Sequence, residues 1–153
     1  MMEKELYELL LQEDKIIKSL IDLANKKQNV IVQNDYDGLN KVNEGESNLL
    51  SNLDKVSRNQ QKLVSRLFDI NSLEENGKPR ILSILVNDYK DLFNPGQLKK
   101  LNELRLQVRD QVKILTDLNH QNRFLIEHAS SLVKETISLL LKTRKTSLID
   151  RKI

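Results

Sequence analysis

Apolar residues recur every three or four positions along most of the chain, which is the spacing of an amphipathic helix. This pattern predicts a first long helix from about Met2 to Gln33, with an apolar stripe wider than a narrow coiled-coil seam. The segment NDYDG, residues 34–38, interrupts the pattern. Asn34 or Asp35 in this segment is a suitable N-cap, so the sequence predicts that a second helix begins here.

Residues 39–70 repeat as heptads, the pattern of helices that pack in coiled coils. Every a and d position in this segment is apolar except Glu46 and Gln60. The segment therefore predicts a long second helix that ends near Ile70. Gly38 and Gly45 each cost roughly 1 kcal/mol in a helix interior, so we expect its first two turns to be its weakest part.

Residues 71–96 have a different character. Gly77 and Pro79 interrupt the helical pattern, and NPG at 94–96 predicts a stop followed by a turn. Between these breaks, ILSILVNDYKDLF (81–93) predicts one short helix of about 12–14 residues. A last long helix follows from about Gln97 to Leu141, roughly 65 Å long if it is unbroken.

Together these segments predict an all-α protein, an elongated antiparallel helical bundle or coiled coil of three long helices plus one short helix. We expect more than about 65% helix, well above the share in an ordinary globular protein, and essentially no strand. The chain has 153 residues, only 4% of them aromatic and 31% charged, which fits slender helices better than a sheet or an aromatic core. We expect one helical domain over residues 1–141 and a flexible tail over 142–153.

The net charge of +3 comes from that tail. Its basic residues are Lys142, Arg144, Lys145, Arg151 and Lys152, against the single acid Asp150. Three interpretations remain open: a solvated, frayed helix end, a segment that folds on a protein partner, or a nucleic-acid contact. The last has the least support, because the tail lacks the aromatic residues that accompany basic ones in nucleic-acid binding, and we expect no nucleic-acid partner.

Composition also bears on chemistry and compartment. The absence of Cys excludes a disulfide framework and a thiolate site, and it fits a reducing compartment. The start MMEKELYELL has no apolar signal-peptide core, and no apolar run exceeds three residues, so we expect a cytoplasmic protein without membrane insertion. His120 and His128 are eight residues apart and do not form an i, i+4 metal pair, and there is no glycine-rich phosphate loop. We therefore expect no enzyme activity, metal or cofactor.

The last long helix has an unusually wide apolar face. Beside its a and d positions runs a column of e positions: Val112, Asn119, Ile126, Val133 and Leu140. Asn119 and Asn122, three residues apart, lie side by side on this face among leucines. Two interpretations stay open. An Asn at a core position can fix the register between helices. Alternatively, the surplus face receives another protein's amphipathic helix, and the amides orient it.

The segment LNHQNRFLI, residues 118–126, resembles the FlgN family of flagellar export chaperones. The resemblance lies in its first leucine, its Asn-x-x-Asn pair and the apolar residues at its end, Leu125 and Ile126. The layout of residues 1–141, from the long first helix to the long last one, is similar to that family as well. The resemblance implies a cytosolic chaperone that binds the carboxy-terminal helical segment of flagellar hook-associated proteins, the proteins of the hook–filament junction. It also implies that the chaperone prevents premature assembly and aids delivery to the flagellar type III export apparatus.

In the family, cargo contact lies in the carboxy-terminal part of the chaperone. The motif carries this role onto Asn119, Asn122, Leu125 and Ile126. The predicted cargo-binding residues on this face are Leu118, Asn119, Asn122, Leu125, Ile126, Ala129, Val133, Ile137 and Leu140. The alternative function is a structural coiled-coil or adaptor protein, in which neighbouring helices cover the last helix fully. A nucleic-acid-associated helical protein is a weaker third possibility. The cargo's identity and the oligomeric state are left open.

Overall fold

The protein is all-α, as the sequence predicts. The computed structural model describes residues 2–73, 77 and 79–152, and side chains as far as residue 145. Helices make up 91% of these described residues and none of them is in a strand, which confirms the expected helix content.

Helices α1 (Met2–Val32) and α2 (Tyr36–Ile70) form an antiparallel hairpin. In the turn, Asn34 takes a positive φ of 54° and the Asp35 carboxylate accepts a hydrogen bond of 2.9 Å from the Gly38 amide. The predicted N-cap is therefore confirmed at Asp35. A Cβ at Gly38 would lie 2.9 Å from Cγ1 of Val30, so glycine lets the start of α2 pack closely against the end of α1.

The predicted short helix over residues 81–93 is divided in two, so that prediction is wrong. The segment forms α3 (Leu82–Asp88) and a single 3₁₀ turn, η1 (Lys90–Leu92). Tyr89 ends α3 with φ −122° and ψ 45°, and its ring packs edge-on against Phe68 with 5.8 Å between centroids. Tertiary packing of this ring and of buried Phe93 takes the backbone out of the helix, although the local apolar spacing favours one.

Helix α4 runs from Pro95 to Lys152, 58 residues and roughly 87 Å. Its start has the predicted signals: Pro95 is in the first helical position and Asn94 Oδ1 accepts a 2.9 Å hydrogen bond from the Gly96 amide. The predicted end at Leu141 is wrong, because the backbone stays helical through residues 142–152. No Gly or Pro follows Gly96, so nothing in the local chemistry ends the helix earlier.

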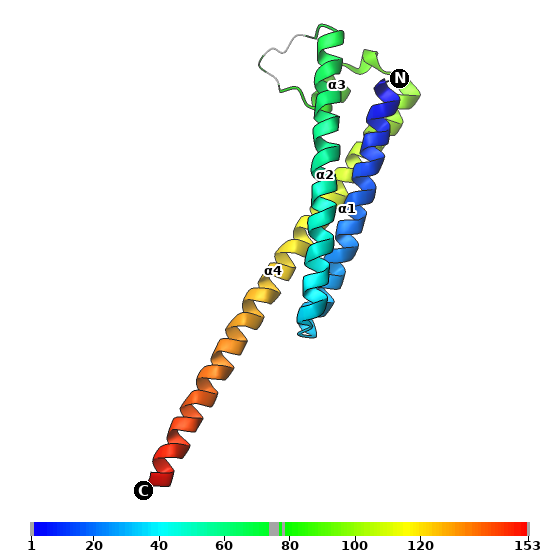
Figure 1. Ribbon diagram of the computed structural model, residues 1–153. Coiled ribbons are helices and arrows are strands. Elements are labelled where there is room, and N and C mark those ends of the chain that lie inside the picture. The colour runs from blue at the N-terminus through cyan, green and yellow to red at the C-terminus, as the bar shows by residue number, and fades with distance from the viewer. Residues whose placement is uncertain (1, 74–76, 78, 153) are drawn as a thin grey trace.

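Helix α1 is the central element and packs against both α2 and α4. Figure 1 shows α2 antiparallel to α1, whereas α4 runs in the same direction as α1. The core lies at the end where α1 and α4 begin and α2 finishes, closed by α3 and η1. Its buried residues are Leu6, Leu10, Ile17, Leu63, Val64, Leu67, Phe68, Leu85, Val86, Phe93, Leu101, Leu104 and Val108. The far half of α4 continues past the hairpin turn, beyond the cover of α1 and α2 (Figure 1).

Candidate binding surface

Polar contacts between α1 and α4 mark the covered part of α4. Gln107 Nε2 donates to both carboxylate oxygens of buried Asp14 at 3.3 Å, and Lys18 Nζ lies 2.8 Å from the same carboxylate. Further along, Asn122 is only 2% exposed, and its Nδ2 donates a 2.8 Å hydrogen bond to the Ala24 carbonyl. The Lys18–Asp14 pair lies within α1, whereas the bonds of Gln107 and Asn122 join α1 to α4 in one alignment and so fix the register of the two helices.

The two asparagines of the sequence motif therefore have different surroundings. The Asn122 side chain lies inside the α1–α4 contact, and its Oδ1 has no hydrogen-bond partner in the described part of the chain. The Asn119 side chain is exposed. Leu118 and Leu125 are half-buried. This geometry fits the register interpretation for Asn122 and leaves Asn119 accessible to a partner.

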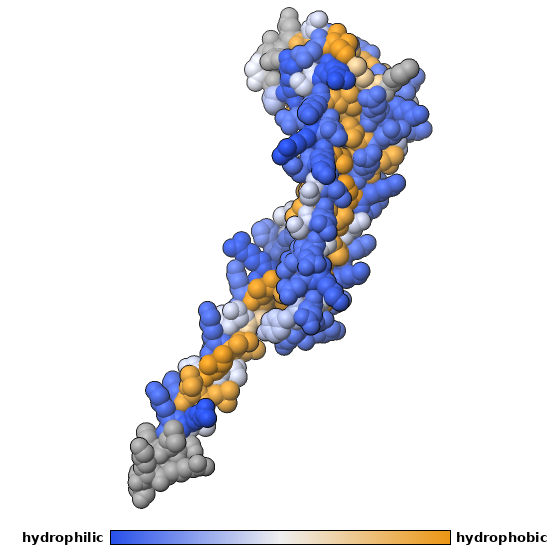
Figure 2. Space-filling model, in the orientation of Figure 1, coloured by the Kyte–Doolittle hydropathy of each residue, from blue (hydrophilic) through white to orange (hydrophobic). Residues whose placement is uncertain are grey.

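Beyond Asn122 the apolar face of α4 becomes progressively more exposed. Val133 is 48% exposed, Ile137 52% and Leu140 65%, all large values for branched apolar side chains. We call Ile126, Ala129, Val133, Ile137 and Leu140 the α4 stripe, since their spacing of three and four places them on one face. Leu132, Leu139 and Leu141 widen the exposed apolar area. In Figure 2 this surface appears as a continuous orange patch on the projecting part of α4.

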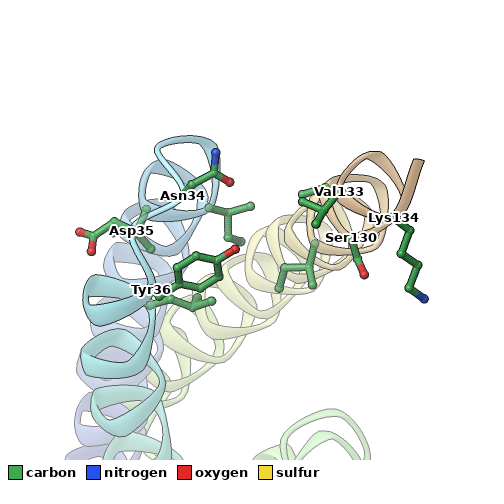
Figure 3. Close-up of a pocket in the computed structure, with 11 residues that line it drawn as sticks. Asn34, Asp35, Tyr36, Ser130, Val133 and Lys134 are labelled. Carbon is green, nitrogen blue, oxygen red and sulfur yellow. The ribbon is translucent and has the colours of Figure 1, made fainter. Parts of the chain in front are cut away.

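A cleft of about 350 Å³ lies where α4 passes the hairpin turn. Its lining is contributed by the end of α1, the turn, the start of α2 and α4: Val30, Ile31, Asn34, Asp35, Tyr36, Leu39, Ile126, Ala129, Ser130, Val133 and Lys134. Figure 3 shows Tyr36 and Val133 pointing toward each other from the two sides, while Asp35 and Lys134 point away. The interior of the cleft is therefore apolar and its charged groups lie at the rim.

Charge is distributed unevenly along this surface. Asp35 and Asp37 are exposed at the hairpin turn. From Ala129 to Lys145 the charged residues are Lys134, Glu135, Lys142, Arg144 and Lys145, four of them basic. Arg144 follows Ile137 by seven residues and so lies at the far end of the stripe. The surface is acidic at the turn and basic toward the end of α4.

Within the hairpin, paired polar groups link α1 to α2. Gln60 Nε2 donates to Glu13 Oε2 at 3.1 Å, and Lys27 Nζ lies 3.0 Å from Glu46 Oε2. Burial raises the pKa of Glu13, and the hydrogen bond from Gln60 opposes this shift to a smaller extent. Gln60 and Glu46 are the two polar residues that interrupt the apolar heptads of α2, and each is paired with a polar side chain of α1.

Among the described residues there is no cluster of three or more His, Cys, Asp or Glu side chains that could hold a metal ion. His120 and His128 are both exposed, and the His128 ring stacks on Phe124 with 6.0 Å between centroids. Of the described helices, none is both long enough and apolar enough to cross a membrane.

The sequence pattern does not predict that the hairpin side of the cleft binds a partner. Tyr36 directly follows the predicted turn, and periodicity alone predicts no binding role for Val30, Ile31 or Leu39. The available signal was Tyr36 itself, a large aromatic residue directly after a turn, which is 71% exposed. A single exposed aromatic residue is common on a protein surface, so it is the position of the Tyr36 ring across the cleft from Val133 that marks this residue.

Comparison with known proteins gives one match. The family model described as FlgN protein matches residues 1–149, nearly the whole chain. Comparisons with curated proteins and with solved structures found no match. The family match confirms the resemblance carried by LNHQNRFLI and extends it through α1, α2 and α3 to most of α4. The chain belongs to the FlgN family, the flagellar export chaperone family.

Proposed function

We propose that this protein is a cytosolic, non-enzymatic chaperone that binds the carboxy-terminal helical segment of flagellar hook-associated proteins. Bound cargo is kept from premature assembly and is delivered to the flagellar export gate. Family membership supports an export chaperone role in general terms. The more specific assignment of cargo depends on the fit between an amphipathic helix and the uncovered face of α4.

The observation that carries this proposal is the exposure of the α4 stripe. A contiguous apolar surface on a helix costs free energy in water and typically marks a protein interface. A helix-shaped guest with apolar residues at i, i+3, i+4 and i+7 matches it, as in other helix-in-groove complexes. A structural coiled-coil or adaptor role in which α4 is fully covered does not explain the uncovered residues Ile137 and Leu140.

The test uses substitutions in the part of the stripe that lies beyond the cleft. Ile137→Asp and Leu140→Asp each place a carboxylate in the proposed contact and remove little packing, since both residues are more than half exposed. We expect each to weaken binding of a hook-associated carboxy-terminal peptide by at least about 2 kcal/mol, the effect of an interface anchor. Isothermal titration calorimetry measures this loss.

Ser131→Asp is the matched control, because Ser131 is exposed on the same helix but away from the stripe. It introduces the same charge, and the affinity for the peptide should stay within about twofold, a difference of ~0.4 kcal/mol. Thermal unfolding of all three variants should match the parent protein. If Ile137→Asp and Leu140→Asp bind the peptide as tightly as the control, cargo does not use this stripe and the proposal is wrong.

A further inference from the structure

The cleft at the hairpin turn is continuous with the α4 stripe. Ile126, Ala129 and Val133 belong to both, so a helix lying on the stripe meets the hairpin at one end. There the guest contacts two walls, whereas beyond Val133 it contacts α4 alone. The cleft therefore distinguishes one end of a bound helix from the other.

The interior of the cleft suits a bulky apolar side chain. Val30, Ile31 and Leu39 form its hairpin wall, with the Tyr36 ring at the opening toward α4 (Figure 3). Its volume of about 350 Å³ exceeds what one large side chain fills, and it is at the lower end of the range of pockets that hold a ligand. One or two large apolar side chains from a partner helix would bury this surface.

The charges around the surface favour one direction for the guest. A helix carries about half a positive charge at its amino terminus and half a negative charge at its carboxy terminus. Asp35, which caps α2 and points away from the cleft, and Asp37 make the hairpin turn acidic, so they attract the positive end through their field rather than by direct contact. Arg144 and Lys145 attract the negative end, and Lys134 between them attracts acidic residues on the guest's flank.

We propose that the cleft anchors the amino-terminal end of an acidic amphipathic partner helix, which then lies along the α4 stripe parallel to α4. The identity of the bound helix rests on the proposed function. The inference adds the hairpin as a second contact surface, Tyr36 as an anchor residue and a direction for the bound helix. Tyr36, Leu39 and Val30 on the hairpin become partner-contact residues. The hairpin turn sets the register of the guest, as Asn122 sets the register of α4 on α1.

Direction can be measured because the chain contains no Cys and no Trp. Gln33→Cys at the turn and Thr143→Cys near the end of the stripe each give a single position for a nitroxide label. Both side chains are exposed. Thr143 is 13 residues beyond cleft-lining Ser130, about 20 Å along the helix. The probe is a designed peptide of about 20 residues with a leucine face and glutamate flanks, carrying a fluorophore at either end.

We expect the nitroxide at Gln33→Cys to quench the amino-terminal fluorophore more strongly, and the nitroxide at Thr143→Cys to quench the carboxy-terminal one. The reverse pattern, equal quenching of both ends, or no binding of the peptide overturns the inference. The anchor is tested separately by Tyr36→Ala, with Leu50→Ala as a control. Leu50 is an exposed apolar residue on the same helix, 14 residues from Tyr36. We expect Tyr36→Ala to weaken peptide binding about tenfold and Leu50→Ala to leave it unchanged.

A hook-associated carboxy-terminal peptide, assayed in parallel, separates this inference from the proposed function. If the designed peptide binds in the expected direction but the hook-associated peptide does not bind, the cargo assignment fails and the cleft proposal stands. If the hook-associated peptide depends on Ile137 and Leu140 but not on Tyr36, the proposed function stands and the anchor is refuted.

Discussion

Replacing Asn122 by leucine tests what the amide does inside the α1–α4 contact. Its Nδ2 donates to the Ala24 carbonyl, a bond with a net value of about 0.5–1.5 kcal/mol. The Oδ1 atom is buried without a hydrogen-bond partner among the described residues, which costs about 1–3 kcal/mol. Ala24 lies within α1, so its carbonyl also accepts the helical hydrogen bond from the backbone amide of Gln28. Losing the Asn122 bond therefore does not leave this carbonyl without a donor.

Leucine branches at the same atom as asparagine and adds apolar contact among the leucines around it. At the middle of these two ranges, the relieved desolvation exceeds the lost bond by about 1 kcal/mol, and the added apolar contact brings the net stabilisation to about 1–2 kcal/mol. For a chain of this size, that corresponds to a rise in Tm of about 2–8 °C. Under the proposed function, affinity for the hook-associated peptide should be unchanged, because the residue faces α1.

Two further variants establish the sign of this effect. Asn122→Asp has the same shape but replaces the donor with a carboxylate in a buried position, so it should destabilise the fold by at least about 2 kcal/mol. Asn119→Leu changes an exposed side chain and should alter the unfolding free energy by less than about 0.5 kcal/mol. Urea unfolding followed by circular dichroism gives all three values, and calorimetry gives the peptide affinity.

The reasoning is refuted if Asn122→Leu lowers the unfolding free energy by more than about 1 kcal/mol, since the amide bond would then outweigh the buried acceptor. A loss of peptide affinity with an intact fold would be a different failure. It would mean that Asn122 faces the guest, as the second sequence interpretation proposed. A change in oligomeric state would indicate that the polar residue also excludes other helix partners.

Three further predictions concern other parts of the molecule. Deleting residues 142–153 should leave the urea midpoint nearly unchanged, because residues 142–145 are exposed; a loss of several kcal/mol would show that the tail is packed. Arg80→Ala should destabilise the fold by about 1 kcal/mol, measured by urea unfolding, because its guanidinium reaches α2 at a 2.7 Å contact with partly exposed Asp69. Burial raises the pKa of Glu13 above its ordinary value of 4.5. The free energy of unfolding should therefore fall as pH rises from 4.5 to the raised pKa of the folded protein, and it should stay lower at higher pH. Glu13→Gln, which keeps an acceptor for Gln60, should remove this loss in unfolding titrations at pH 4 and pH 7, and equal pH dependence in both proteins would contradict the assignment.

The helices were predictable because their signals are local. The Asp35 cap, the Asn94–Pro95–Gly96 start and the heptads of α2 each act within one or two turns of the residues that carry them. The division of residues 81–93 into α3 and η1 was not predictable in this way. It depends on the Tyr89 ring meeting Phe68, a residue 21 positions earlier on another helix.

The candidate surface was predictable only in part. Periodicity indicates that Asn122 and Ile126 share a face, but it cannot say which of them α1 covers. That outcome depends on where the hairpin turn falls along α4, and hence on the helix lengths and the alignment that Asn122 and Asp14 fix. The cleft was missed for the same reason, since it brings Tyr36 beside Val133, 97 positions away in the sequence.

The uncovered half of α4 raises the question of why it stays helical without a partner. A short isolated helix is marginal in water, chiefly because nucleation is unfavourable. Here the packed half of α4 supplies the helix nucleus, and the uncovered half only extends it. No Gly or Pro follows Gly96 to interrupt the helix. The Arg123–Glu127 ion pair, at 3.1 Å, stabilises the exposed side. A guest on the stripe therefore meets a surface that is already ordered, so little of its binding free energy is lost in folding α4. On this argument, substitutions of the buried residues of α4, such as Leu104 and Val108, should act mainly on stability, and substitutions on the α4 stripe should act mainly on binding.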